Sequence, residues 1–164
     1  MIARYVSMAV FLALVVLAAA IAGSFAAGEW YYALNKPSWT PPPWFFAPLW
    51  AFLYLTMALA AWQVWLSGYY SRLGALTWWM IQLALNVAWS WLYFDLHRLG
   101  WAWLELSLLI AVVVLCIRAF YLLSKSAAYL MMPFLIWLIF SWVLNLAIWT
   151  MNGGLFSKVL LALG

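Results

Sequence analysis

The chain has very little charge. Only 6% of its 164 residues are charged, and three of these are acidic. The seven lysines and arginines give a formal net charge of +4, but they are scattered and form no basic patch, so nucleic-acid binding is not expected. Hydrophobic residues make up 72% of the sequence, and such a composition excludes an ordinary soluble domain.

Residues that commonly bind metals or carry out catalysis are scarce as well. The single cysteine, Cys116, allows no disulfide within one chain, and its apolar surroundings predict a small buried side chain. The single histidine, His97, excludes a multi-histidine metal site. We expect His97 to lie in a turn. The more specific alternative is that His97 serves as an axial haem ligand. The sequence has no glycine-rich phosphate loop and no serine with an evident base partner, so no familiar catalytic constellation is present.

Long apolar runs dominate the sequence instead. A membrane-spanning helix needs roughly 20 mostly apolar residues, and backbone groups in lipid must be hydrogen-bonded internally. The chain is therefore predicted to be an all-α integral membrane protein, a five-transmembrane-helix bundle forming one domain over residues 1–164. The predicted helices cover about residues 5–27, 44–66, 73–94, 101–123 and 127–150.

One long stretch interrupts the apolar runs. Five of the six prolines lie between residues 29 and 54. Clustered prolines remove backbone donors and favour extended or turn conformations. We therefore expect a long Pro/Trp-rich loop over residues 28–43, between the first two helices.

The predicted helices have distinct faces. The third helix carries a polar and aromatic stripe, which we expect to face the bundle interior: Gln82, Asn86, Trp89 and Tyr93. Ala84 and Ala88 lie on nearly the opposite side and favour packing against another helix, such as one from a second protomer. In the first helix, Ala19, Gly23 and Ala27 form a small-residue row that would permit close helix approach.

Few polar residues lie within the predicted helices, and each needs a partner because polar groups in a membrane are costly. Asn86 and Asn145 lie near mid-helix. They either hydrogen-bond between the third and fifth helices, or to freed carbonyls, or contact a ligand held between the helices. Glu105 lies in the first turn of a helix, where the helix dipole favours an anion, and ligand or loop contact is its alternative role.

Tryptophan is in large excess. Fifteen tryptophans exceed what the interfacial belts of five helices require. Trp50, Trp89, Trp137 and Trp142 lie deeper within the predicted helices. We expect them to line a cavity for a large, flat, apolar ligand, because aromatic stacking adds to the free energy of area burial.

Motifs that resemble a known family are spread over nearly the whole chain. In order they are Trp30-Tyr31, Leu34, Lys36-Pro37-Ser38-Trp39, Pro41-Pro42, Pro48-Leu49-Trp50, Leu53-Tyr54, Gln82-Leu83-Ala84-Leu85-Asn86, Gly100-Trp101-Ala102, Pro133-Phe134-Leu135-Ile136-Trp137-Leu138, Leu144-Asn145 and Trp149. Together these motifs resemble the TspO/translocator protein family, the tryptophan-rich sensory proteins. The resemblance implies a bundle of five helices, often dimeric, with the first loop folded as a lid over a pocket.

The resemblance also implies a function. Members of the family bind porphyrins such as protoporphyrin IX, the mitochondrial ones bind cholesterol and synthetic drugs, and some bacterial ones resemble light-dependent porphyrin-degrading catalysts. We therefore expect a receptor for protoporphyrin IX, haem or similar tetrapyrroles that needs no further cofactor. The alternatives are a light- and oxygen-dependent porphyrin-degrading enzyme, a lipid or steroid transporter, and a scaffold whose loop docks a partner protein.

Candidate site residues follow from the same resemblance. Trp50 and Trp137 match the pocket tryptophans tied to porphyrin degradation, and are the candidate catalytic residues. The full set expected to contact ligand is Trp39, Trp50, Tyr54, Asn86, Trp101, Glu105, Trp137, Ser141, Leu144 and Asn145. Ala84 and Ala88 match a dimer face. Leu146 and Thr150 replace the aromatic and arginine of a cholesterol motif, so high cholesterol affinity is not expected. A bacterial-type membrane is favoured over the mitochondrial outer membrane.

Overall fold

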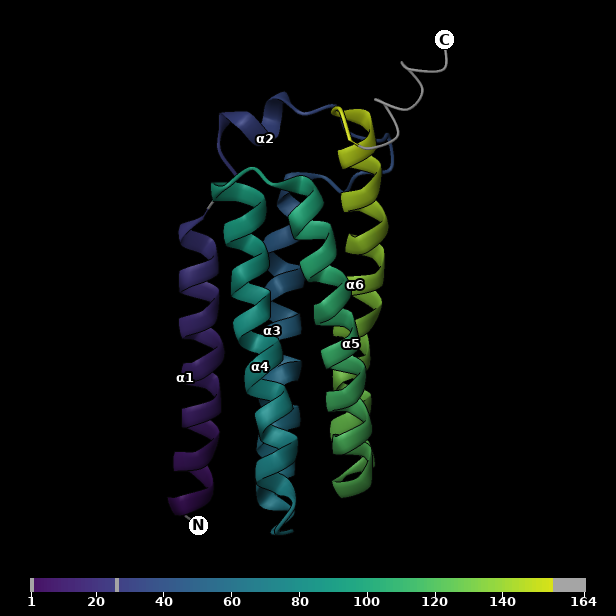
Figure 1. Ribbon diagram of the computed structural model, residues 1–164. Coiled ribbons are helices and arrows are strands. Elements are labelled where there is room, and N and C mark those ends of the chain that lie inside the picture. Colours follow the sequence, from purple (N-terminus) through teal and green to yellow (C-terminus); the bar gives the residue numbers. More distant parts are fainter. Residues whose placement is uncertain (1, 26, 155–164) are drawn as a thin grey trace.

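The computed structural model describes residues 2–25 and 27–154. This part of the chain folds into six α-helices and one π-helical segment, without strands. The long helices stand side by side, and the short helix α2 lies across one end of the bundle (Figure 1). In chain order the elements are α1 (Ile2–Ser24), α2 (Glu29–Ala33), α3 (Pro43–Leu66), α4 (Arg72–Ser90), η1 (Trp91–Asp95), α5 (Leu99–Leu123) and α6 (Lys125–Met151).

Local sequence explains where two of these helices begin. Pro43 occupies the first turn of α3, where a helix needs no backbone N–H donor. Ser124 precedes α6, and its hydroxyl accepts a hydrogen bond from the Ala127 N–H at 3.3 Å. The first helix ends at Ser24, three residues before the predicted end, and α2 lies within the stretch expected to be a loop.

The third predicted helix changes its geometry near its end. It is α-helical as far as Ser90 and continues as the π-helical segment η1, with the Leu96 N–H bonded to the Trp91 carbonyl at 3.0 Å. The expected interior stripe is confirmed, because Gln82, Asn86 and Tyr93 are all buried. On the other side of α4, Ala84 is exposed.

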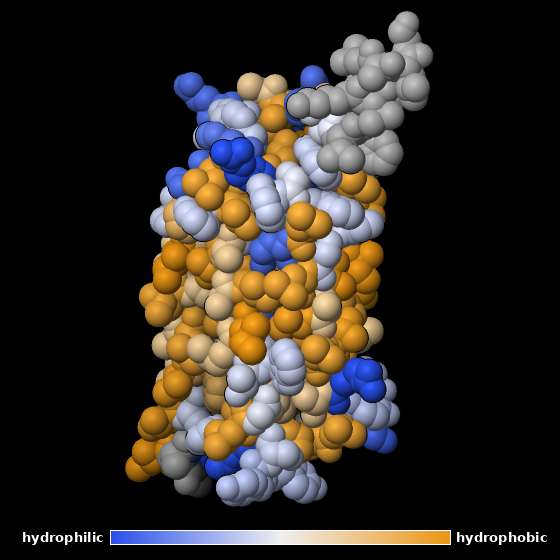
Figure 2. All heavy atoms as spheres, viewed as in Figure 1, coloured by the Kyte–Doolittle hydropathy of each residue, from blue (hydrophilic) through white to orange (hydrophobic). Residues whose placement is uncertain are grey.

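The outer surface of the bundle is apolar. Hydrophobic side chains cover the middle of the molecule and hydrophilic ones gather toward its two ends (Figure 2). Four described helices are long and apolar enough to cross a membrane: α1, α3, α5 and α6. Leu122 is 83% exposed, and Val16 and Ile136 are each 64% exposed. Such a continuous apolar surface is stable in lipid rather than in water. The chain is an integral, multi-pass membrane protein.

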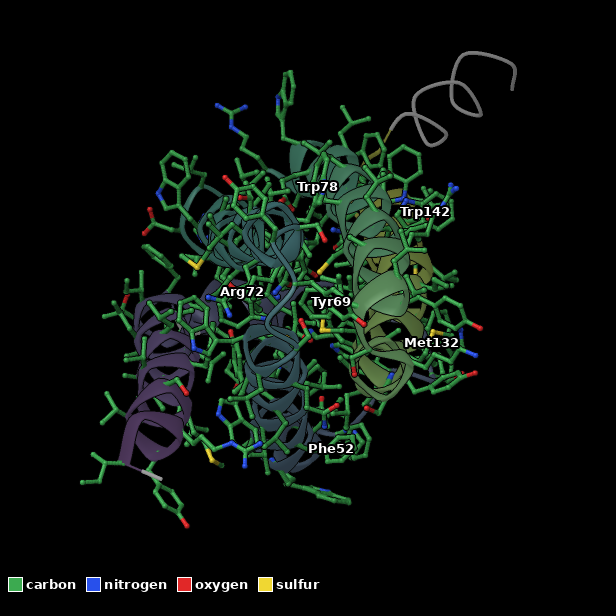
Figure 3. The ribbon with its side chains drawn as sticks, turned by 90° about the horizontal axis from the view of Figure 1, so that it is seen from below. Phe52, Tyr69, Arg72, Trp78, Met132 and Trp142 are labelled. Carbon is green, nitrogen blue, oxygen red and sulfur yellow. The ribbon has the colours of Figure 1, made fainter. Side chains whose placement is uncertain are left out.

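Two hydrophobic clusters hold the helices together. The larger runs through the bundle and contains the fully buried Trp79, whose indole N–H donates to the Met57 carbonyl at 3.1 Å. Cys116 is fully buried in the same cluster, as expected. Seen from the end opposite α2, α1 lies at one side of the bundle while α5 and α6 lie together at the other (Figure 3). The smaller cluster lies beneath α2 and is built around Tyr93, Leu99, Ala102, Leu144 and Ile148.

Candidate functional site

A cavity of about 930 Å³ lies between the helices near α2. Its walls come from the end of α1, from α3, from α4 with η1, and from α6. The connection between α1 and α3, residues 27–42, also lines it, with Tyr31, Lys36 and Pro41 among others. Ligand sites in proteins have volumes of roughly 300–1,000 Å³. The cavity is therefore at the upper end of this range and is large enough for a sizeable organic ligand.

Most of the site residues predicted from the sequence lie in the wall of this cavity. They come from three helices: Trp50 and Tyr54 from α3, Asn86 from α4, and Trp137, Ser141, Leu144 and Asn145 from α6. The structure therefore brings together residues that are almost 100 positions apart in the sequence.

Three predicted residues lie outside the wall. Trp101 is 65% exposed, at the start of α5, a helix that contributes nothing to the wall. Glu105 is on α5 as well, with both carboxylate oxygens buried and no hydrogen-bond partner among the described residues. Trp39 is 46% exposed and contacts Phe140 edge-on at 5.8 Å, and Phe140 in turn stacks on Trp137. The ring of Phe140 thus lies between Trp39 and Trp137, which lines the cavity.

Trp50 and Trp137 each lie within an aromatic group. The Trp50 ring is 5.4 Å from Tyr54 and 6.4 Å from Phe134. Trp137 stacks on Phe140 at 5.1 Å, with an angle of 27° between the rings. Packing of this kind holds indole rings in defined positions, so the cavity is lined by fixed aromatic surfaces. Trp142, also expected in the wall, instead faces α5, where its N–H donates to the Ser107 hydroxyl at 2.8 Å.

The polar side chains of the wall differ in how they are paired. The Tyr54 hydroxyl donates to the Asn86 side-chain oxygen at 2.9 Å and thereby joins α3 to α4. Asn86 is therefore hydrogen-bonded to α3, whereas the sequence predicted a bond to the fifth long helix, α6. Asn145 is 2% exposed, yet neither atom of its amide has a hydrogen-bond partner among the described residues. The indole N–H of Trp89 is unpaired in the same way.

Lys36 is the one charged residue among those that line the cavity in the described part of the chain. Its ammonium group donates to the carbonyls of Tyr31, Leu34 and Tyr32 at 2.6, 2.9 and 3.3 Å. It also lies 4.7 Å from the centre of the Tyr31 ring. A cation at these carbonyls compensates the negative end of a helix dipole, which explains how the five-residue helix α2 is stabilised.

Tyr31 lines the cavity and carries a neutral phenol. Burial raises the pKa of its hydroxyl above the usual 10.0, and the neighbouring Tyr32 raises the pKa further. The group therefore remains protonated at neutral pH and can donate a hydrogen bond to a ligand.

Two contacts attach the α1–α3 connection to the bundle. The Asn152 side chain accepts a hydrogen bond from the Asn35 N–H at 3.0 Å and donates to the Asn35 carbonyl at 2.8 Å. At the other side, Trp30 stacks on His97 with 4.0 Å between ring centres. His97 has the left-handed φ of 54° and lies in the turn before α5, as expected, outside the cavity wall.

The structure corrects the role predicted for the small residues of the first helix. A Cβ atom added to Gly23 would meet nothing within 4 Å, so this position is not one of close helix packing. Ala19, Gly23 and Ala27 instead line the cavity. Trp89 and Tyr93 also line it, and the interior stripe of the third helix already contained the signal for both.

The chain is similar in sequence to known proteins over most of its length. The sequence profile of the TspO/MBR family matches residues 9–150. The chain is 40% identical over 129 residues to the translocator protein of Sus scrofa, covering 77% of this chain and 76% of that protein. It is 35% identical over 143 residues to the tryptophan-rich protein TspO of Archaeoglobus fulgidus, covering 85% and 93%. Protein CrtK of Rhodobacter capsulatus is 34% identical over 140 residues, with 84% and 87% covered.

Proposed function

Because the chain belongs to the TspO/MBR family, we propose that it is a membrane receptor that binds tetrapyrroles of the protoporphyrin IX type in the cavity beneath α2. The cavity itself is the observation that carries this proposal. It has a volume of about 930 Å³ and combines aromatic walls from three helices with a single charged residue among the described lining.

The chemistry of the wall suits a flat, apolar ring system. Trp50, Trp89 and Trp137 come from α3, α4 and α6, so indole rings border the cavity on three sides. A planar ligand gains both area burial and stacking from such walls. The carboxylates of a porphyrin would lie toward the α1–α3 connection, where Lys36 supplies positive charge and Tyr31 a hydrogen-bond donor.

Titration of the purified chain with protoporphyrin IX tests this proposal. We expect saturable binding that weakens when Trp50 or Trp137 is replaced by alanine, because each substitution removes an aromatic surface from the wall. Trp101→Ala is the matched control, since Trp101 is exposed outside the cavity. A flat titration curve for the unmodified chain, or equal weakening by Trp101→Ala, would contradict the proposal.

We propose light- and oxygen-dependent porphyrin degradation as the second candidate function. The observation that favours it is that Trp50 and Trp137 line one cavity, where both can meet the same ligand. Such photochemistry requires oxidisable side chains near the ligand rather than a general acid or base. Under illumination in air we expect the porphyrin absorption band to decay. The double variant Trp50→Phe/Trp137→Phe should bind the porphyrin like the parent but degrade it more slowly. Parent-like decay in this double variant would remove the proposed role of the two tryptophans.

We also propose that α4 with η1 forms a fifth membrane span, and that two copies pair through the outer face of α4. Ala84 lies exposed on that face, where a small side chain allows another helix to approach closely. A bulky Ala84→Trp substitution is expected to shift the oligomer toward monomer in lipid nanodiscs, as read by single-molecule photobleaching. A bacterial-type membrane remains our proposal for the location.

A further inference from the structure

Charge is divided unequally between the two ends of the bundle. At the end opposite α2, the helices α1, α4 and α6 begin and the helices α3 and α5 end (Figure 1). The cations toward that end are Arg4, Arg72, Arg118 and Lys125. The acidic residues of the chain lie toward the α2 end, and these are Glu29, Asp95 and Glu105. The end opposite α2 therefore carries positive charge that no described acidic side chain compensates.

Arg72 is held at this end by Trp65. Its guanidinium carbon lies 4.4 Å from the centre of the Trp65 ring, and one of its nitrogens donates to the Trp65 carbonyl at 3.1 Å. These contacts orient the guanidinium group, and the hydrogen bond uses only one of its N–H donors. Helix α4 also begins at Arg72, and no side chain caps its first turn. The positive end of the helix dipole therefore adds to the charge of Arg72.

Trp62 brings the start of α1 to the same place. It lies one turn before Trp65 on α3, and its indole N–H donates to the Arg4 carbonyl at 3.2 Å. Helix α1 packs against both α3 and α4, and Arg72 lies where these three helices meet (Figure 3). We call the surface formed by Arg4, Trp62, Trp65 and Arg72 the α1–α3–α4 corner. It joins two arginines that are far apart in the sequence.

The two arginines of the corner need a counter-charge. Like charges repel each other, and an anion bound to both arginines would turn this repulsion into attraction. A guanidinium group matches phosphate especially well, because its planar fork of N–H donors can bond to two phosphate oxygens at once. Arg4 is exposed and Arg72 is only partly buried, so an anion can reach both side chains. The corner is therefore suited to a phosphate group.

The surroundings of the corner favour a lipid phosphate over a soluble one. Tryptophan side chains such as Trp62 and Trp65 are typical of the membrane interface, where lipid headgroups lie. Exposed apolar side chains continue from the corner along its helices, with Val6 56% and Val10 51% exposed on α1 and Leu73 61% exposed on α4. Acyl chains gain free energy by covering such a surface, whereas a free phosphate does not. A zwitterionic headgroup would bring its own cation into a region that is already positive, so an anionic headgroup fits better.

We propose that the α1–α3–α4 corner binds one anionic phospholipid, whose headgroup phosphate accepts hydrogen bonds from Arg4 and Arg72. The acyl chains of this lipid lie along the apolar faces of α1 and α4. Because the two arginines belong to different helices, the bound lipid also ties α1 to α4. This inference goes beyond the proposed function, since the four residues of the corner do not line the cavity.

Native mass spectrometry of the full chain in detergent tests the inference. The chain is titrated with phosphatidylglycerol, which is anionic, or with phosphatidylcholine of the same acyl chains, and the Kd of the first bound lipid is measured. We expect phosphatidylglycerol to bind about tenfold or more tighter. The double variant Arg4→Gln/Arg72→Gln should weaken the binding of phosphatidylglycerol roughly 10- to 30-fold, because each arginine near an anionic headgroup contributes a several-fold gain in affinity.

The double variant Arg118→Gln/Lys125→Gln is the matched control. It removes the same charge from the same end of the bundle, but from α5 and α6, outside the corner. Lys125 also lies 5.7 Å from the centre of an aromatic ring, that of Tyr121, so the control removes a comparable cation–π contact. We expect this variant to keep most of the preference for phosphatidylglycerol.

A single variant separates lipid contact from damage to the fold. Arg72→Gln also removes the contacts to Trp65, whereas Arg4→Gln keeps the contact to Trp62, because Trp62 bonds to the backbone of Arg4. Arg4→Gln alone should therefore weaken phosphatidylglycerol binding several-fold while the thermal stability in detergent stays at the parent value.

Three results would overturn the inference. Equal affinity of the parent for the two lipids would show that the headgroup charge is not recognised. Equal losses in the two double variants would show that only the total charge of this end matters. Displacement of the bound lipid by an equal concentration of inorganic phosphate would identify the corner as a site for a soluble anion instead.

Discussion

Asn152 is predicted to control how firmly the α1–α3 connection is held over the cavity. This residue follows the last turn of α6, and its side chain makes two hydrogen bonds to the backbone of Asn35. Its nitrogen also donates to the Ile148 carbonyl at 2.7 Å, which orients the amide. Asn152→Leu removes all three bonds while keeping a similar side-chain volume.

The magnitude follows from the number and the exposure of these bonds. A hydrogen bond contributes about 0.5–1.5 kcal/mol net, and the two bonds to Asn35 lie at an exposed position, which favours the lower part of that range. We therefore expect the connection to lose about 1–2 kcal/mol of attachment. Since about 1.4 kcal/mol corresponds to a tenfold change, the open fraction should rise roughly 5- to 30-fold. Global unfolding should change much less, because the bundle core is untouched.

Hydrogen–deuterium exchange measures this opening directly. Amides of residues 29–41 are expected to exchange faster in Asn152→Leu by the same factor, and porphyrin to dissociate faster. Asn35→Ala is the control, because the contact uses the Asn35 backbone and this variant should keep the parent exchange rate. Unchanged exchange in Asn152→Leu, or equally fast exchange in Asn35→Ala, would refute the reasoning.

Three further predictions concern packing and pH. Tyr54→Phe leaves the buried Asn86 oxygen unpaired and should lower the free energy of unfolding by about 1–2 kcal/mol, measured by thermal denaturation in detergent. Gly100→Ala should destabilise by about 1–3 kcal/mol in the same assay, because its Cβ would lie 2.8 Å from the Trp149 ring. The pKa of Tyr31 is raised by burial, so its contribution to the attachment of α2 is complete below pH 10.0 and declines as pH rises through the folded-state pKa. Hydrogen–deuterium exchange of the α2 amides, corrected for the intrinsic pH dependence of the exchange rate, should show this loss of attachment at alkaline pH. Tyr31→Phe should abolish the loss.

Each of these predictions has a matched control. Tyr5 is 68% exposed, so Tyr5→Phe should leave stability unchanged. A Cβ added to Gly74, within α4, would meet nothing within 4 Å, so Gly74→Ala should be neutral or stabilising. Tyr32 is 61% exposed, and Tyr32→Phe should retain an alkaline loss of α2 attachment. A control that behaves like its test variant would contradict the corresponding prediction.

The sequence by itself determined the long helices and the interior face of α4. Hydrophobic runs interrupted by proline and polar turns mark helix ends, because the backbone in lipid must be bonded within each segment. The spacing of Gln82, Asn86 and Tyr93 identified their common buried face, since helical periodicity is a local property. Family motifs located Trp50 and Trp137, which do share one cavity.

The tertiary structure decided which element each helix face meets. Trp101 belongs to a family motif, yet it is exposed, because α5 packs behind the cavity rather than beside it. Gly23 lies in a row suited to helix packing, yet it borders the cavity. The partner of Asn86 is Tyr54 rather than a residue of α6, and the partner of Asn35 is Asn152. Periodicity shows which residues share a face, but the neighbour of that face depends on how all the helices pack together.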